Sequence, residues 1–284
     1  MILAVFSLSL SWLVKVAAGS TVLLAARYVL LAGVAWLLCY VFFRRAWFHR
    51  KIIARYPRAG QIGREVGYSV LSMVIFSLVG AVTMAMAKMG WTRLYWKVDQ
   101  RGVAWFWLSI GLAIFLHDTY FYWTHRLMHH RRLFRYFHRV HHLSHNPSPW
   151  ASYAFDPLEA VVQAGIFPLT AFLIPIHPIA FGIFMMWQIL FNVAGHTGYE
   201  FHPRWLMRSG LGWFLNTPTN HVMHHETLRG NYGLYFNFWD RLMGTNQAGY
   251  EDRFHEVTGR GRRAEPKGEV VVDGFGPERD VPEV

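Results

Sequence analysis

The sequence predicts an all-α integral membrane protein with four transmembrane helices, two plus a hairpin-like pair, and a cytosolic helical cap. Of its 284 residues, 53% are hydrophobic and 16% are charged, and the mean hydropathy is positive. This composition lies outside the range of ordinary soluble domains. Several apolar runs are long enough to cross a bilayer, which takes about 20 residues. Histidines cluster after the third of these runs, where a cap would begin.

The transmembrane helices are assigned from the apolar regions in chain order. Three continuous runs cover residues 17–43, 67–89 and 103–123. A fourth region, 158–195, is interrupted by Pro175 and Pro178, which predicts two helices that enter and leave on one side. Met1–Val14 is apolar but lacks a basic leader, so we expect an interfacial helix and no cleaved signal peptide.

The basic residues indicate which way the helices run. Between the first two spans lie Arg44, Arg45, Arg50, Lys51, Arg55, Arg58 and Arg64, against Arg93, Lys97 and Arg101 between the next two. The positive-inside tendency places the first loop in the cytoplasm, of a bacterial inner membrane or an ER membrane. The histidines and residues 196–284 then lie on that same side.

The chain divides into three parts. Residues 1–66 form an N-terminal membrane segment with a basic loop, 67–250 a catalytic region, and 251–284 a polar tail that we expect to be partly disordered. The net charge of +11 comes from residues that flank apolar runs, which does not indicate a nucleic-acid partner. Cys39 is the single cysteine, so neither a disulfide nor a cysteine-based metal site can form within the chain.

Three histidine clusters have the spacing of metal ligands on helices. They are His125 with His129, then His138 with His141 and His142, and then His221 with His224 and His225. On a helix, positions i, i+3 and i+4 fan over about 100° of one face, so each cluster can direct ligands toward two adjacent ions. Imidazole suits Fe, Zn, Cu and Ni. We therefore predict a histidine-rich site for two metal ions.

Further residues are candidates near these clusters. His196, where the hairpin returns to the same surface, is a possible ninth ligand. Glu200 lies four residues later and is either a ligand, an orienting group or a structural carboxylate. Asp118 precedes His125 by seven residues, on the same helical stripe about 10 Å away. It is expected to orient a ligand or to be solvated at the helix end.

The motifs resemble a known family. HDTYFYWTHRLMHH, HRVHH and NTPTNHVMHHETLRGNYGLYFNFWDRLMGT, within residues 103–250, are similar to the fatty acid hydroxylase and sterol desaturase superfamily of integral-membrane di-iron oxygenases. PSPWASYAFDPLEA is most similar to the sterol C-5 desaturase branch, although Tyr153 and Asp156 replace histidines of that pattern. HTGYE is closer to the C-4 methylsterol oxidase branch.

The resemblance implies a di-iron site with O₂ as co-substrate. By this resemblance, the metal ligands of the family correspond to nine histidines of this chain: His125, His129, His138, His141, His142, His196, His221, His224 and His225. Asn231 begins NYG and Asp240 lies in WDRLMGT, and these two stretches match the trailing motif that follows the third cluster in the family. Their expected role is to pack against the third cluster and to form hydrogen bonds with it. The implied activity is hydroxylation or desaturation of a lipid that is sterol-like, fatty acyl or otherwise amphiphilic.

Two consequences follow for partners and alternatives. Haem and flavin motifs are lacking, so electrons would come from a ferredoxin, a b-type cytochrome or a reductase that docks on the basic face. A zinc-dependent membrane hydrolase is the main alternative, but the HExxH motif that would supply its general base is absent. A metal transporter or haem carrier would need ligands near the bilayer midplane, whereas these collect at one end.

Overall fold

The computed structural model describes residues 9–261, which form helices and loops with two isolated β-bridges and no strand. Four helices in this part are long and apolar enough to cross a membrane. They are α2 (Leu10–Trp36, continued by a π-helical turn at Leu37–Phe42), α3 (Ala59–Lys88), α4 (Gly102–Met128) and α9 (Pro178–Gly195). The prediction of an all-α membrane protein with four spanning helices is confirmed.

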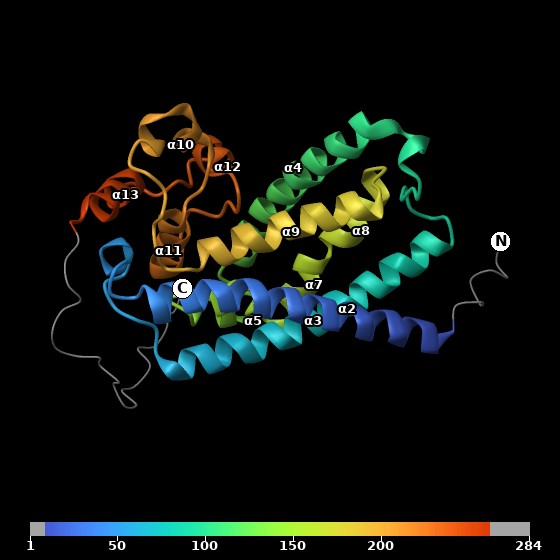
Figure 1. The fold of residues 1–284 in the computed structure, drawn as a ribbon, viewed down its shortest axis with the longest axis horizontal. Helices are drawn as coiled ribbons and strands as arrows, with labels where there is room; N and C mark the ends of the chain where they lie inside the picture. The colour runs from blue at the N-terminus through green and yellow to red at the C-terminus, as the bar shows by residue number, and fades with distance from the viewer. Residues whose placement is uncertain (1–8, 262–284) are drawn as a thin grey trace.

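The spanning helices pack as two pairs. Helices α2 and α3 lie side by side on one flank of the bundle, and α4 and α9 form the other flank, with α7 (Pro157–Ala164) and α8 (Ile166–Leu173) between the pairs (Figure 1). One apolar core joins α2, α3, α7 and α9, and a second joins α4, α8 and α9. Helix α9 therefore connects both cores.

The outer surface of the bundle is apolar, as a lipid-facing surface must be. On α2, Val22 and Leu23 are each 70% exposed and Leu30 is 63% exposed. In water such side chains would cost roughly 25 cal/mol for each Å² exposed, a cost that a hydrocarbon environment removes. The exposed apolar face of α2 is consistent with contact to lipid.

The first two spans begin earlier than predicted. The Ser9 hydroxyl accepts a hydrogen bond from the Trp12 N–H and caps α2, so Leu10–Val14 belong to the first span and do not form a separate interfacial helix. Residues 1–8 of that predicted segment lie outside the described residues. Helix α3 begins at Ala59, eight residues before the predicted start at 67.

The predicted hairpin has two unequal arms. The break at Pro175 and Pro178 is present, and Pro178 begins α9. The first arm also bends at Gly165, where a Cβ would lie 2.5 Å from the Tyr120 hydroxyl oxygen. From 157 to 173 this arm would be about 25 Å long if it were straight, shorter than the hydrocarbon core of about 30 Å. Only the second arm, α9, is long enough to span.

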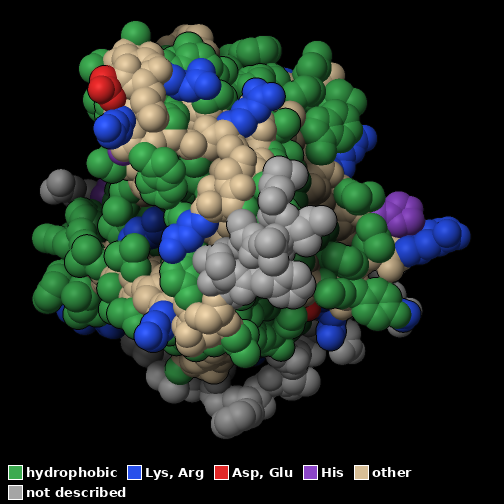
Figure 2. Space-filling view, turned by 90° about the vertical axis from the view of Figure 1, so that its right-hand side faces the viewer, with side chains coloured by type: hydrophobic (Ala, Val, Ile, Leu, Met, Phe, Trp, Pro, Cys, Tyr) green, Lys and Arg blue, Asp and Glu red, His purple; other side chains and the backbone are tan. Residues whose placement is uncertain are grey.

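Short helices form a cap at one end of the bundle. They are α5 (Phe134–Phe137), α6 (Arg139–His142), α10 (Gly210–Phe214), α11 (Pro218–Thr227), α12 (Phe238–Leu242) and α13 (Tyr250–Gly259). A 3₁₀ helix at Pro149–Tyr153 instead enters the bundle and contacts α2, α3 and α9. The loop between α2 and α3 lies at this end, and the loop between α3 and α4 lies at the other (Figure 1). Figure 2 looks onto the other end, where Lys and Arg side chains also lie among hydrophobic ones.

Part of the predicted polar tail is ordered. Residues 250–259 form α13, because Val257 packs with Ile52 and Val222 in a small buried cluster. The Arg253 guanidinium also donates to the Ile52 carbonyl, 3.0 Å away. Helix α13 thus packs against both the α2–α3 loop and α11 and holds them together. Residues 262–284 of the tail lie outside the described residues.

Candidate metal centre

Nine histidines from four parts of the chain meet where the cap joins the spanning helices. They form a five-histidine group and a four-histidine group, and within each group one nitrogen of every residue lies within 4.8 Å of the others. The five-histidine group is His125, His129, His138, His142 and His224, and the four-histidine group is His141, His196, His221 and His225. Eight of the nine are buried, and His129 is partly exposed. The nine residues proposed from the sequence are the nine that the structure brings together.

The two HxxHH motifs each serve both groups. His141 and His142 point to different groups, and so do His224 and His225, because successive helical residues are about 100° apart. The third motif lies on the ten-residue helix α11, as predicted. The second does not lie on one helix, since His138 has φ −143° and ψ 0° between α5 and α6. That break turns His138 toward the five-histidine group.

Backbone carbonyls fix the orientation of several rings. The Nδ1 atoms of His125, His141, His196 and His224 lie 2.7–3.2 Å from the carbonyls of Tyr232, Ala154, Asn192 and Gly230. A carbonyl oxygen only accepts, so each Nδ1 carries the proton and each Nε2 has a free lone pair. The chain therefore presents unprotonated Nε2 atoms to the interior of both groups.

The spacing between these nitrogens matches a metal coordination shell. Nε2–Nε2 distances are 3.0 Å for His196 and His221, 3.1 Å for His129 and His142, and 3.4 Å for His141 and His196. With metal–nitrogen bonds of about 2.1 Å, adjacent ligands are about 3.0 Å apart in an octahedron and about 3.4 Å in a tetrahedron. His141 and His196 oppose two lone pairs, which repel unless a cation lies between them. The donor set thus fits two metal ions.

Burial keeps these imidazoles neutral. It lowers the pKa of His196 to about 4, and it lowers the pKa of His138, His141 and His221 well below the ordinary value. Neutral imidazole is the form that binds a metal ion. At pH 7 the site is therefore ready for cations without first releasing protons.

Glu200 lies outside both histidine groups. Helix α9 ends at Gly195, so the helical continuation that would have placed Glu200 beside His196 is absent. The buried Glu200 carboxylate instead accepts hydrogen bonds from the Thr219 N–H (3.1 Å) and hydroxyl (2.8 Å) and from His202. Thr219 is in the first turn of α11, so Glu200 holds the start of the helix that carries the third cluster.

Asp118 and Asn231 also hold the loop after α11 and touch neither group. The Asp118 carboxylate accepts from the Tyr235 N–H (2.8 Å) and the Phe236 N–H (3.2 Å). Asn231 has φ 53°, a left-handed conformation that Asn tolerates. Its side chain donates to the Asn220 carbonyl (3.0 Å) and accepts from the Gln247 N–H (2.8 Å).

Asp240 is the centre of the trailing motif. Its buried carboxylate accepts from the Tyr232 N–H, the Gly233 N–H and the Thr245 hydroxyl at 2.7–2.8 Å. The Tyr232 carbonyl is the acceptor for His125 Nδ1, so Asp240 is one residue away from a ring of the five-histidine group. Asp240 therefore helps to hold the Tyr232 carbonyl where it accepts from His125.

Replacing Asp240 with alanine is expected to lower the stability by about 2 kcal/mol or more, because the Tyr232 and Gly233 N–H groups would be left without partners at roughly 1–3 kcal/mol each. The melting temperature should fall, and bound metal should be lost as His125 loses its acceptor. Thermal melts and metal content measure both effects. Glu251→Ala, at an exposed ion pair with Arg241, is the control; an equal loss there would contradict this role for Asp240.

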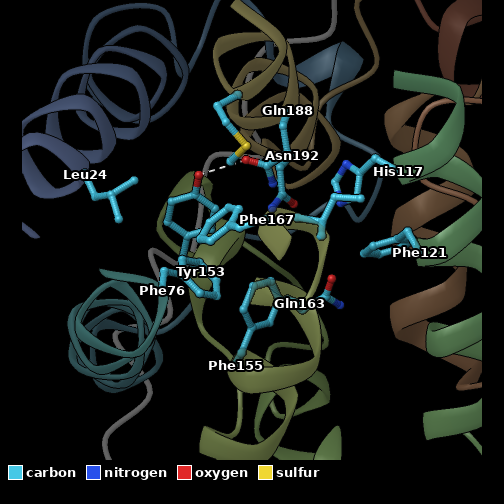
Figure 3. A pocket seen from close by; sticks show the side chains of 12 residues that line it. Leu24, Phe76, His117, Phe121, Tyr153, Phe155, Gln163, Phe167, Gln188 and Asn192 are labelled. Carbon is cyan, nitrogen blue, oxygen red and sulfur yellow. Dashed lines mark hydrogen bonds between the residues drawn. The ribbon is translucent and has the colours of Figure 1, made fainter. Parts of the chain in front are cut away.

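Figure 3 shows a narrow cavity among α2, α3, α4, α7, α8 and α9. It is lined by Leu24, Phe76, His117, Phe121, Tyr153, Phe155, Gln163, Ile166, Phe167, Met185, Gln188 and Asn192. Phe121 packs on His125 and Phe155 on His141, with ring centroids 5.0 and 5.2 Å apart. The space open to the centre of a water molecule is about 20 Å³, room for one or two waters. A lipid can enter only if the lining side chains move.

Two more residues lie here: Glu159 was not singled out from the sequence, and Tyr153 was noted there only as a departure from the C-5 desaturase pattern. Glu159 Oε2 lies 2.8 Å from His138 Nδ1, and both side chains are buried. Tyr153 donates to Gln188 Oε1 at 2.9 Å and accepts from Arg27 at 3.4 Å, which gives the charge within α2 a polar partner. The sequence shows Glu159 as an acid within the largely apolar DPLEA segment, but its spacing from the histidine clusters does not indicate that it lies near His138.

Comparison with known proteins places the chain in a family. The fatty acid hydroxylase family model matches residues 110–245, which include all nine histidines. A Delta(7)-sterol 5(6)-desaturase of Gibberella zeae is 30% identical over 249 residues, covering 87% of this chain and 72% of that protein. The chain belongs to the fatty acid hydroxylase family. The resemblance seen in the histidine motifs, and in the PSPWASYAFDPLEA segment, is confirmed.

Other relatives in the fatty acid hydroxylase family are similar over less of their length. The lathosterol oxidase of Rattus norvegicus is 29% identical over 65% of this chain and 61% of that protein. The lathosterol oxidase of Homo sapiens is 26% identical over 68% of this chain and 64% of that protein. The chain thus spans less than two thirds of these two relatives. No solved structure matches it significantly.

Proposed function

We propose that the protein is a membrane-bound di-iron oxygenase that uses O₂ and electrons from a separate donor to hydroxylate or desaturate a lipid. One observation carries this proposal: two groups of histidine Nε2 atoms, spaced as coordination shells, lie next to an apolar cavity inside a membrane protein. The names of the relatives, sterol desaturase and lathosterol oxidase, favour a sterol-like substrate.

The ligand count leaves room for chemistry at both ions. If the ions held by these histidines were octahedral, five histidines would leave one position open and four would leave two. Two iron ions held there would supply the redox chemistry that activates O₂ and breaks an unactivated C–H bond, which zinc cannot do. The protein's contribution is to hold the neutral imidazoles in place and to keep bulk water out.

The cavity residues would position the substrate. Phe121 and Phe155 each touch a histidine of one group and also line the cavity, so a lipid between them would lie against both groups. The polar side chains of Tyr153 and Gln188 lie in the same lining and suit an amphiphile that carries an oxygen atom. Entry from the bilayer is the expected route, since the cavity lies among the spanning helices.

The electron donor would dock on the cap. The α2–α3 loop is richer in Lys and Arg than the α3–α4 loop, which favours a cytoplasmic cap. Exposed arginines, Arg131, Arg132, Arg135 and Arg139, lie close to the second histidine cluster in sequence. A ferredoxin, a b-type cytochrome or a reductase with an acidic surface would be attracted there.

Metal analysis of the detergent-purified protein tests the class of enzyme. Two irons per chain are expected. One zinc per chain would instead support a zinc-dependent membrane hydrolase, and a Soret band would support a haem carrier. Either of these results would contradict the proposal.

The substrate can be found by comparing lipid extracts of host cells that do or do not express the protein. We expect one lipid to gain a hydroxyl group or to lose two hydrogens, and a His141→Ala variant should leave the extract unchanged. A product that appears equally with the variant would show that the reaction does not need His141, which would contradict the role proposed for the four-histidine group.

A further inference from the structure

Two helices of the cap, α10 and α12, expose large hydrophobic side chains. Leu211 and Trp213 of α10 are 54% and 55% exposed, and Leu242 of α12 is 70% exposed. From residue 205 to residue 217 the chain has one charged side chain, that of Arg208. An open groove of about 480 Å³ lies where the two helices meet, with Trp213 and Leu242 among its walls. Surfaces that face water rarely group this much apolar area, so the patch is expected to have a partner.

Helix α12 packs against the outer face of the spanning helix α4. The Phe238 ring stacks on that of Phe115, with centroids 5.9 Å apart. The Trp239 ring packs on that of Trp123, with centroids 5.7 Å apart, and the Trp239 indole N–H donates to the Thr119 hydroxyl at 3.2 Å. Phe115 and Trp123 are themselves exposed, so they belong to the apolar outer surface of the bundle. The exposed patch on α12 is therefore continuous with the lipid-facing surface of α4.

The length of α4 sets the depth of this contact. Its 27 residues rise about 40 Å, and the hydrocarbon core of a bilayer is about 30 Å thick. Because α4 crosses the core, at most about 10 Å of the helix can extend beyond it, and less if the helix is tilted. Phe115 is 13 residues from Met128, the last residue of α4, which is about 20 Å along the axis. The Phe115 ring therefore lies inside the hydrocarbon core, and so does the Phe238 ring that stacks on it.

Helix α10 is held beside α12. The Phe214 ring of α10 stacks on Phe238, with centroids 6.1 Å apart. Leu242 is four residues after Phe238 and so lies on the same face of α12. Figure 1 shows both helices on the α4 side of the cap, whereas α13 lies at the end of the cap away from the spanning helices. Trp and Arg side chains are typical of the headgroup level of a bilayer, which suits the exposed Trp213 and Arg208.

We propose that α10 and α12 form a membrane-inserted part of the cap: Phe238 and Leu242 contact lipid acyl chains beside α4, and Trp213 lies at the headgroup level. The bilayer is the partner because the patch continues the lipid-facing surface of α4 and reaches the depth of Phe115. This inference needs neither a metal ion nor a substrate, so its failure would leave the proposed function unchanged.

The accessibility of spin labels measures the depth of these helices. The full chain is placed in nanodiscs of phosphatidylcholine and phosphatidylglycerol, one chain per disc, after Cys39 is replaced with alanine. Leu242→Cys and Trp213→Cys carry the nitroxide label in turn. Leu23→Cys, on the lipid-facing side of α2, is the membrane reference, and Glu256→Cys, on α13, is the water reference. All four labelled positions are exposed, so the label should leave the fold intact.

Two relaxing reagents report on each label, because O₂ concentrates in lipid whereas a nickel chelate stays in water. The ratio of O₂ to nickel collisions should be several-fold higher for the label at Leu242 than for the label at Glu256, and close to that at Leu23. The label at Trp213 should lie between the two references. A label at Leu242 that matches the one at Glu256 would show that α12 lies in water and would overturn the proposal. A label at Leu242 that is shielded from both reagents would show that protein covers the patch, which would overturn it as well.

Discussion

Replacing His141 with alanine is expected to abolish turnover and to remove metal from the four-histidine group. The Nε2 atom of His141 lies 3.4 Å from that of His196, and its ring packs on Phe155 at the cavity wall. The variant therefore removes a ligand at the side where a substrate would bind. Three remaining histidines would hold the ion weakly, and the metal content should fall from two ions toward one.

The spanning helices should be unaffected, since His141 lies in the cap and not within a spanning helix. Membrane insertion of the variant should equal that of the wild type, as measured by extraction from membranes. His255→Ala is the control, because His255 lies on α13, outside both groups. It should change neither turnover nor metal content. Equal effects of the two substitutions would count against the ligand assignment.

The spanning helices could be predicted because their cause is local. A stretch of about 20 apolar residues is favourable in lipid wherever it occurs, so composition alone located α2, α3, α4 and α9. The short arm α7–α8 was harder to predict. The chain at 149–156, just before this arm, already lies inside the bundle, where the Tyr28 hydroxyl of α2 donates to the Trp150 carbonyl. The arm therefore starts part-way into the bundle, and composition alone does not indicate this.

The nine histidines that meet could be named from the sequence, but their division into two groups could not. Helical spacing indicated that one cluster could face two ions but did not say which histidine belongs to which group, and the backbone break at His138 follows from contacts that the spacing does not contain. Of the four carbonyls that orient rings, the Tyr232 carbonyl is far in sequence from its histidine, and the loop that holds it depends on further distant contacts. Tyr232 is 107 residues from His125, and Asp118 is 117 residues from the Tyr235 N–H that it binds.

Acidifying the metal-free protein is expected to unfold the cap between about pH 6.5 and pH 4. Burial lowers the pKa of His196 to about 4, from 6.5 in an unfolded chain. Between these values the unfolded chain binds more protons, so the stabilisation is complete above pH 6.5 and is lost as the pH falls toward 4. His196 alone would account for roughly 3 kcal/mol at pH 7, at about 1.4 kcal/mol for each pH unit.

The pKa values of other buried histidines are lowered in the same direction. The summed loss of stability on acidification is therefore large against a typical free energy of unfolding of about 5–15 kcal/mol. The pKa of His129, His142, His224 and His225 is also lowered well below its ordinary value by burial. Melting temperatures at pH 7, 6 and 5 should therefore fall steeply without metal. Bound metal should move the fall to lower pH, because it competes with protons for the same nitrogens. A melting temperature that is the same at pH 7 and pH 5 without metal would show that these imidazoles are not buried as neutral groups.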